Sequence, residues 1–280
     1  MAPHSGAAVY RHTVADDGAR RWVGSMPEAY EKWLVPTVFG PFAVDLAARI
    51  AARAPARVLE VAAGTGVLTR ELARVVPDAA VTATDLNDAM VALGRTRAPG
   101  ATWQQADAMR LPFDDAGFDV VACQFGVMFL PDKPAGYAEV RRVLTPDGTF
   151  VFNSWSTLAT HEFEAAFMAT LERIFPTDPP TFLARTPHGY ADPNLIVADL
   201  QAGGLRCRQV HTVTLQGRAE SVAGLATGYC TGTPVRAEIV DRGDLTTTIA
   251  TVVRELEAKL GSGPITVGMT AYVVEATPAS

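Results

Sequence analysis

Five short β-rich runs alternate with helical segments between residues 57 and 155, and this alternation constrains the fold more than any other feature of the chain. Strands that alternate with helices of this length are joined by parallel crossovers. The pattern therefore predicts an α/β fold with a doubly wound, Rossmann-like sheet. Ligands of such sheets bind beyond the carboxyl ends of the strands. The runs are RVLEVA (57–62), AAVTATDL (79–86), ATWQQAD (101–107), FDVVACQF (118–125) and TFVFNSW (149–155).

The regular alternation ends after residue 157. Residues 161–175 and 216–262 carry apolar side chains at helical spacing, whereas LRCRQVHTVTL and PITVGMTAYVVEA alternate as strands. We interpret the helical insertions as caps folded over the carboxyl edge of the sheet. The expected layout is a single domain of residues 1–280, with a lid segment (1–40), a cofactor-binding core (41–157), cap insertions (158–191 and 216–262) and two segments that complete the sheet (192–215 and 263–280).

Composition narrows the class of protein. The net charge of −6 argues against a nucleic-acid binder, which usually carries a basic face. Cys123, Cys207 and Cys230 lie far apart, so neither a metal site nor a disulfide framework is expected. The first residues do not read as a signal peptide, and we find no run of about 18 apolar residues. We therefore expect a cytoplasmic protein with no metal, no nucleic-acid partner and no membrane partner.

The stretch RVLEVAAGTGVLTREL joins the first strand to a helix through Gly64 and Gly66. Glycines at such a turn allow close backbone approach and positive φ. Asp85 ends the second strand, where an acid accepts hydrogen bonds from both hydroxyls of a ribose. These features fit a nicotinamide dinucleotide and S-adenosylmethionine, and they also fit a turn without a ligand and an acid that caps a helix.

Three observations favour S-adenosylmethionine. Thr69 stands where a dinucleotide fold needs a third small residue. Glu60 lies in the strand before the glycines, where a carboxylate repels a pyrophosphate but favours an amino acid moiety with a sulfonium. Asp107, Ala108 and Met109 follow the third strand and supply one polar partner and apolar contacts of the kind an adenine ring needs.

Four segments, in the correct order and spacing, resemble the signature segments of class I S-adenosylmethionine-dependent methyltransferases. The nearest subgroup is the ubiquinone/menaquinone-biosynthesis-like small-molecule enzymes, and the resemblance spans roughly residues 40–155. It implies a seven-stranded sheet with an antiparallel last strand. Ala62 departs from the pattern because the family usually has its first glycine there. The segments are VLEVAAGTG, ATDLNDAM, ADAMRLPFDDAGFDVVACQFGVMFLPDK and EVRRVLTPDGTFVF.

The resemblance implies S-adenosylmethionine as cofactor and S-adenosylhomocysteine as product. Glu60, Ala62, Gly64 and Gly66 would line the methionine part, and Asp85 would hold the ribose. The other implied contacts are Leu86 and Met90 beside the adenine, Asp107 at its amino group, Ala108 at the ring with Met109 next to it, and Gln124 and Phe125 near the transferable methyl.

Side chains outside the signature segments complete the candidate site. Tyr30 and Trp33 fit a lid over the cofactor, because aromatic faces attract a sulfonium as they attract ammonium groups. They fit packing between a surface helix and the sheet equally well. A base is needed only if the acceptor arrives protonated, and His161, His188 and His12 are the candidates for it.

The segment after the fourth strand reads CQFG, whereas enzymes that methylate amino groups of bases or glutamine carry Asp/Asn-Pro-Pro-aromatic there. We therefore predict methyl transfer from S-adenosylmethionine to a small organic molecule, with oxygen favoured over carbon or nitrogen as the acceptor atom. Two alternatives stay open. One is an NAD(P)-dependent oxidoreductase, and the other is a methyltransferase-fold protein that uses bound cofactor structurally, as a cyclase or scaffold.

Overall fold

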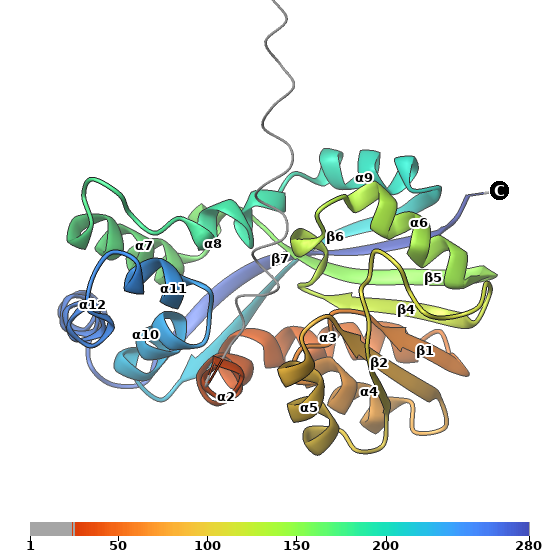
Figure 1. Ribbon diagram of the computed structural model, residues 1–280, viewed down its shortest axis with the longest axis horizontal. Helices are drawn as coiled ribbons and strands as arrows, with labels where there is room; N and C mark the ends of the chain where they lie inside the picture. Colours follow the sequence, from red (N-terminus) through yellow and green to blue (C-terminus); the bar gives the residue numbers. More distant parts are fainter. Residues whose placement is uncertain (1–23, 25, 280) are drawn as a thin grey trace, which may run out of the picture.

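The computed structural model describes residues 24 and 26–279, which build an α/β fold around one seven-stranded sheet (Figure 1). The strand order is β3-β2-β1-β4-β5-β7-β6. Strands β1 to β5 pair in parallel, and β7 pairs antiparallel with both β5 and β6. The predicted doubly wound sheet with an antiparallel last strand is confirmed. The strands are β1 (Arg57–Glu60), β2 (Ala80–Asp85), β3 (Thr102–Gln105), β4 (Phe118–Gln124), β5 (Leu144–Trp155), β6 (Leu205–Ala219) and β7 (Ile265–Pro278).

Helices cover both faces of the sheet. In Figure 1, α3, α4 and α5 lie on one side, and α6 and α9 lie on the other. The core on the first side includes Leu46, Leu68 and Val120, and the core on the second includes Tyr137 and Phe152. These side chains are fully or almost fully buried because the parallel strands between the helix layers are apolar on both faces. The helices of these layers are α3 (Gly40–Ala51), α4 (Val67–Val75), α5 (Asp88–Arg97), α6 (Lys133–Val143) and α9 (Pro193–Ala202).

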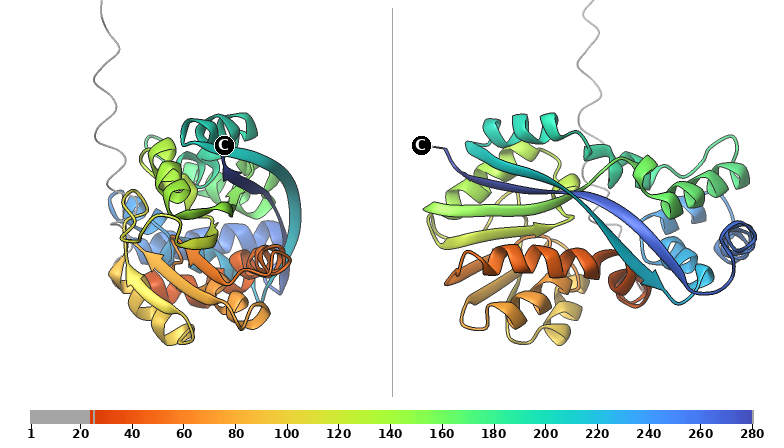
Figure 2. Two further views of the ribbon diagram at one scale, coloured as in Figure 1. Left: turned by 90° about the vertical axis from the view of Figure 1, so that its right-hand side faces the viewer. Right: turned by 180° about the vertical axis from the view of Figure 1, so that it is seen from behind.

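The remaining helices form a cap at one end of the molecule. Strands β6 and β7 run from the sheet into this cap, where α7, α8, α10, α11 and α12 gather around their far ends (Figures 1 and 2). The cap is built from the two insertions expected after the fifth strand. Its elements are η3 (Leu158–Thr160), α7 (Glu162–Ile174), α8 (Phe182–Arg185), η4 (His188–Tyr190), α10 (Val222–Thr231), α11 (Val235–Val240) and α12 (Leu245–Leu260). Outside the cap, the short helix η2 (Val127–Phe129) follows β4.

Two strands are longer than the sequence indicated. We expected β6 to end at residue 215, but it continues to Ala219, which pairs with Ile265. We expected β5 to begin at residue 149, but it begins at Leu144 directly after α6. The prolines and glycines used as boundaries were misleading because pairing with a neighbouring strand outweighs local turn preference.

The segment before the core is one continuous helix formed by α2 (Met26–Ala29), η1 (Tyr30–Phe39) and α3. Its middle part is a π-helix that contains Pro36, and the amide of Gly40 bonds the carbonyl of Val35. Proline removes one amide donor from a helix, and the wider π turn accommodates this loss. Because the segments join, Met26–Ala51 is long and apolar enough to cross a bilayer, contrary to the expectation that the chain has no run of about 18 apolar residues. Half of its most apolar window is buried inside the protein, as in a core helix.

Candidate active site

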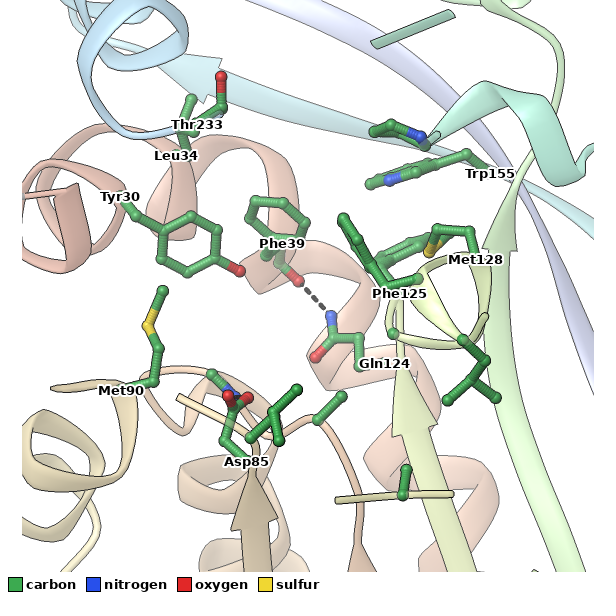
Figure 3. A pocket seen from close by; sticks show the side chains of 18 of the residues that line it. Tyr30, Leu34, Phe39, Asp85, Met90, Gln124, Phe125, Met128, Trp155 and Thr233 are labelled. Atoms are coloured by element: carbon green, nitrogen blue, oxygen red, sulfur yellow. Dashed lines mark hydrogen bonds between the residues drawn. The ribbon is translucent and has the colours of Figure 1, made fainter. Parts of the chain in front are cut away.

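A cavity of about 190 Å³ lies at the carboxyl ends of β1, β2 and β4, between the sheet and the cap. In Figure 3, Asp85 and Met90 lie on one side of it and Trp155 and Thr233 on the other, with Tyr30 reaching in from η1. Its wall contains most of the residues predicted to bind the cofactor. They are Tyr30, Ala62, Gly64, Asp85, Leu86, Met90, Asp107, Ala108, Met109, Gln124 and Phe125.

The glycine turn after β1 is tied to the end of β2. The amide of Gly64 donates a hydrogen bond to one carboxylate oxygen of Asp85 at 2.8 Å, and the amide of Asn87 donates to the other at 2.9 Å. Burial raises the pKa of Asp85, and these amide bonds partly oppose the rise. The amide of Leu86 also bonds this carboxylate, and at least one lone pair remains, because an ionised carboxylate accepts about four hydrogen bonds. Asp85 can therefore also accept bonds from a ligand in the cavity.

Gly64, Gly66 and Ala62 of the turn differ in backbone conformation and in the space around them. Gly64 has a φ of +56°, and an added Cβ atom would meet nothing within 4 Å, so the backbone there faces open space. Gly66 also has positive φ, but an added Cβ would lie 2.9 Å from the Trp103 ring. Ala62 adopts a φ of +53°, a left-handed conformation that favours glycine. The residue that departs from the family pattern thus occupies a strained position.

Glu60, Gly66 and Trp33 were predicted to contact the cofactor, but the structure places them outside the cavity wall. Glu60 lies beneath the turn and accepts a hydrogen bond from the Thr69 hydroxyl at 2.6 Å. Burial raises its pKa to about 8, against the opposing effect of that bond. The acid used in the sequence argument against a pyrophosphate is therefore mostly protonated at neutral pH.

Trp33 packs against a cap helix, neither over the cofactor nor against the sheet, the two places that the sequence suggested for it. Its side chain packs against Gly224 and Gly228 of α10, where an added Cβ would come within 2.7 Å of the Trp33 ring and 2.5 Å of its Cβ atom, respectively. These two glycines make room for the tryptophan, so Trp33 fastens the N-terminal helix to the cap. Tyr30, three residues earlier, faces the cavity (Figure 3).

The end of β4 supplies an amide and an aromatic ring. The Gln124 side chain donates to the Phe39 carbonyl at 2.8 Å, whereas its own oxygen is buried and has no hydrogen-bond partner within the described part of the chain (Figure 3). Phe125 has a φ of +53°, and its ring stacks on Trp155 with centroids 3.6 Å apart. Buried polar atoms are normally bonded, so the Gln124 oxygen marks a place where a donor from a ligand fits.

Comparison with known proteins identifies the family. A family described as a methyltransferase domain matches residues 58–148. The demethylmenaquinone methyltransferase of Deinococcus radiodurans is 32% identical over 175 residues, which cover 58% of this chain and 73% of that protein. This chain belongs to the class I S-adenosylmethionine-dependent methyltransferases of the ubiquinone/menaquinone type. It is a methyltransferase with S-adenosylmethionine as its cofactor.

Two further similarities agree with this assignment. The ubiquinone/menaquinone biosynthesis C-methyltransferase of Saccharophagus degradans is 29% identical over 174 residues, covering 56% of this chain and 70% of that protein. A structure of phosphoethanolamine N-methyltransferase 2 from Haemonchus contortus, in complex with S-adenosylhomocysteine and phosphomonomethylethanolamine, shares the fold. Its TM-score is 0.56 at 15% identity, covering 91% of this chain and 57% of that one. The oxidoreductase alternative is not favoured by these matches.

Two of the three histidines proposed as bases in this methyltransferase lie in the cap. His161 and His188 are both buried, and their rings are 4.6 Å apart, whereas His12 lies outside the described residues. Both contact Glu164 of α7, which lines the cavity together with Tyr229 of α10. Sequence analysis missed Glu164 and Tyr229. The only signal for Glu164 was an acid among the apolar residues of a cap helix.

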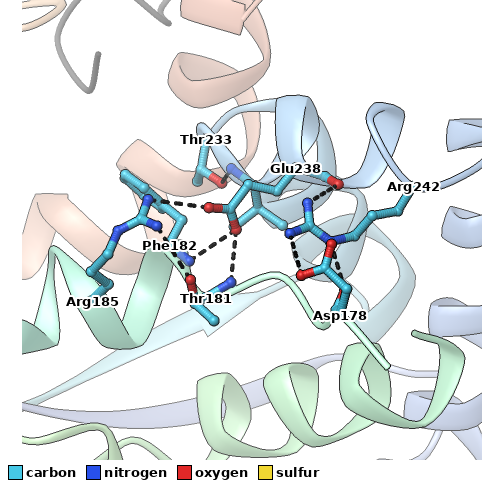
Figure 4. A network of polar contacts seen from close by, with 8 residues as sticks. Asp178, Thr181, Phe182, Arg185, Thr233, Glu238 and Arg242 are labelled. Atoms are coloured by element: carbon cyan, nitrogen blue, oxygen red, sulfur yellow. Dashed lines mark hydrogen bonds and ion pairs between the residues drawn. The ribbon is translucent and has the colours of Figure 1, made fainter. Parts of the chain in front are cut away.

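A second buried acid, Glu238, holds the loop that closes the cap side of the cavity. Its carboxylate accepts hydrogen bonds from the amides of Thr181 and Phe182 at 2.7 and 3.0 Å and pairs with Arg185 at 3.2 Å (Figure 4). Phe182 and the adjacent Leu183 line the cavity. Glu238 therefore fixes the position of part of the cavity wall without contacting the cavity itself.

Proposed function

We propose that this methyltransferase transfers a methyl group from S-adenosylmethionine to a small hydroxylated aromatic molecule of the quinol type. The single observation that carries the proposal is the continuous cavity. One end has the Gly64–Asp85 pair at the strand ends, and the other is enclosed by apolar side chains of the cap. The quinone chemistry comes from the two relatives, which are methyltransferases of menaquinone and ubiquinone biosynthesis.

The residues present fit the cofactor. Asp85 would bind the ribose hydroxyls, and the open backbone at Gly64 leaves space for the methionine part. The buried, unsatisfied oxygen of Gln124 would accept a hydrogen bond from a donor on the cofactor, such as its ammonium group. Met90, in the first turn of α5, and Asp107, two residues after β3, line the cavity and would contact the adenine. We retain these assignments as proposals for individual residues.

The protein's contribution is orientation and exclusion of water. When bound, S-adenosylmethionine would supply a methyl group on a cationic sulfur. A nucleophile attacks the methyl carbon in line with the carbon–sulfur bond, and the sulfur leaves. Tyr30 and Phe39 from η1, with their ring centroids 4.8 Å apart, cover the cavity opposite the sheet. Phe125 and Trp155 stack beneath the cap. These aromatic faces would shield the reacting centre from water and favour the sulfonium charge.

The proposal also specifies the atom of the acceptor that receives the methyl group. Sequence analysis favoured oxygen, but the two quinone-related relatives give this preference no support, and one of them is named a C-methyltransferase. We therefore propose a ring carbon next to a hydroxyl group as the acceptor. A hydroxyl increases the electron density at the adjacent ring carbons, which makes them competent nucleophiles.

The test uses the full chain with methyl-labelled S-adenosylmethionine and 1,4-dihydroxynaphthalene kept reduced under nitrogen. We expect a labelled product whose carbon NMR signal lies in the region of aryl methyl groups. A signal in the methoxy region would return the acceptor atom to oxygen. Failure to bind S-adenosylhomocysteine in calorimetry would reject the assignment of the cavity to the cofactor.

A further inference from the structure

Glu164 is an acidic residue in the wall of the cap end of the cavity. It comes from α7 and is 6% exposed, and Trp155, Phe182 and Leu183 line the same cavity. Its partner His188 lies beside the Trp155 ring, with centroids 6.5 Å apart. Trp155 lies across the cavity from Asp85 in Figure 3, so the acid belongs to the end of the cavity on the Trp155 side. A carboxylate in an apolar wall costs free energy unless it is paired and hydrogen-bonded.

Two neighbours hold this carboxylate in place. His188 donates to one oxygen of Glu164 at 2.6 Å through Nε2, and its Nδ1 donates to the Ser156 carbonyl at 2.6 Å. The Tyr229 hydroxyl donates to the other oxygen of Glu164. Since both ring nitrogens of His188 face acceptors, the ring carries two protons and a positive charge. The result is a buried ion pair with a fixed orientation.

The charge states follow from the contacts. Burial raises the pKa of Glu164, but the hydrogen bond and positive charge of His188, with the His161 ring 3.3 Å away, outweigh it and hold the pKa well below its usual range. Burial lowers the pKa of His188, but the bond to Glu164 outweighs this effect and raises it. Glu164 is therefore ionised at neutral pH, and it is an acceptor of hydrogen bonds rather than a strong base.

Glu164 keeps acceptor capacity for a ligand. An ionised carboxylate offers about four lone-pair sites. His188 and Tyr229 occupy one site each, and His161 Nδ1 lies 3.3 Å from the oxygen that His188 contacts. At least one site remains on the oxygen that Tyr229 contacts. In a cavity end with apolar walls, this site selects a ligand group that donates a hydrogen bond.

A metal ion is the competing explanation, because donor atoms of His161, Glu164 and His188 lie within 4.8 Å of one another. The distance between His188 and Glu164 argues against it. Two ligands about 2.0–2.1 Å from one zinc ion and at least a right angle apart are separated by about 2.9 Å or more. The observed 2.6 Å is the length of a hydrogen bond, so a proton lies between the two side chains.

We propose that Glu164 anchors the acceptor molecule by accepting a hydrogen bond from its hydroxyl or N–H group, with His188 and Tyr229 as positioning residues that keep the carboxylate oriented. This inference rests on the proposed function and specifies the acceptor. The acceptor would have an aromatic or other apolar body and one hydrogen-bond donor group. This donor group would point away from the end of the cavity that holds Asp85.

The test compares two probes with the same ring system, one with hydroxyl donors and one in which methoxy groups replace them. The affinities of 1,4-dihydroxynaphthalene and 1,4-dimethoxynaphthalene are measured by calorimetry with the full chain saturated with S-adenosylhomocysteine. Hydrogen bonds to charged groups change affinity by roughly 10-fold or more. We expect the native protein to prefer the diol by at least this factor and Glu164→Gln to lose most of the preference. Glu162→Gln, an exposed acid on the same helix, is the matched control and keeps it.

Several outcomes would overturn the inference. They are equal affinity for the two probes, binding of neither probe, and an unchanged preference in Glu164→Gln. Stoichiometric metal in the purified native protein would also overturn it, because the carboxylate would then be a metal ligand. If Glu164→Gln does not fold, Tyr229→Phe serves instead. It leaves the ion pair intact but removes a hydrogen bond that orients the carboxylate, so we expect a reduced diol preference, and an unchanged preference would count against the inference.

The cofactor measurement separates this inference from the proposed function. Glu164 lies at the opposite end of the cavity from Asp85, so the affinity of Glu164→Gln for S-adenosylhomocysteine should equal that of the native protein. If neither protein binds S-adenosylhomocysteine, the proposed function fails. If both bind it but the probes are not distinguished, only the role of Glu164 fails.

Discussion

The amide of Gly64 donates a hydrogen bond to the Asp85 carboxylate at 2.8 Å, which ties the turn after β1 to the end of β2. One acid thereby fixes the turn and faces the cavity. We expect Asp85→Ala to lower the affinity for S-adenosylhomocysteine by roughly 10- to 150-fold, the range for loss of hydrogen bonds to a charged group. Calorimetry measures the change. Asp88→Ala, an exposed acid three residues later, is the control, and equal losses in both variants would remove Asp85 from its proposed role.

Gly64 supports a second prediction, because a side chain there would project into open space that we assign to the cofactor. A non-glycine residue in the left-handed region costs about 1–2 kcal/mol. Gly64→Val should therefore lower stability by about this amount and also weaken S-adenosylhomocysteine binding. Gly261→Val is the matched control, since Gly261 has a φ of +89° and open surroundings but lies after α12. It should lose stability and keep its affinity, whereas full affinity in Gly64→Val would contradict the assignment.

Glu60 predicts a pH dependence of stability. Burial raises its pKa to about 8 in the folded protein, from about 4.3 in an unfolded chain. Between these pH values the folded state holds a proton that the unfolded state has lost, so the free energy of unfolding falls as the pH rises. His188, whose pKa is also raised, contributes in the same direction above its unfolded pKa of about 6.5.

A variant isolates the contribution of Glu60. We expect Glu60→Gln to remove its share of the fall, so the stability of the native protein should decrease relative to the variant between pH 5 and pH 8. Urea unfolding at several pH values measures this difference. Glu71→Gln, on α4, should follow the native curve, and parallel curves for Glu60→Gln would show that the buried acid does not take up a proton on folding.

Glu238 predicts an effect on acceptor binding from a residue outside the cavity. It bonds the amides of Thr181 and Phe182, so Glu238→Gln should destabilise the fold by about 1.5–3 kcal/mol and displace Phe182. Acceptor affinity should fall while the affinity for S-adenosylhomocysteine stays the same. Glu255→Gln breaks an exposed pair with Arg173 and should cost at most about 1 kcal/mol. A loss of cofactor affinity in Glu238→Gln would contradict a role confined to the cap.

The sequence by itself determined the sheet, the glycine turn and the position of Asp85. Each depends on residues close together in the chain. Strand periodicity repeats every two residues, helix periodicity every 3.6, and the turn follows β1 directly. The ends of neighbouring parallel strands also meet at one edge, so Asp85 and Asp107 could be assigned to one cavity before any contact was known.

Only the tertiary structure decided how the remaining residues are used. Glu60 lies beneath the turn and is mostly protonated, and Gly66 is small because the Trp103 ring packs against it. Glu164 meets His188 from 24 residues away and Tyr229 from 65 residues away. The physical reason is common to these cases. Burial, and the charge state that follows from it, depends on side chains brought together by packing, and local sequence patterns do not encode those distances.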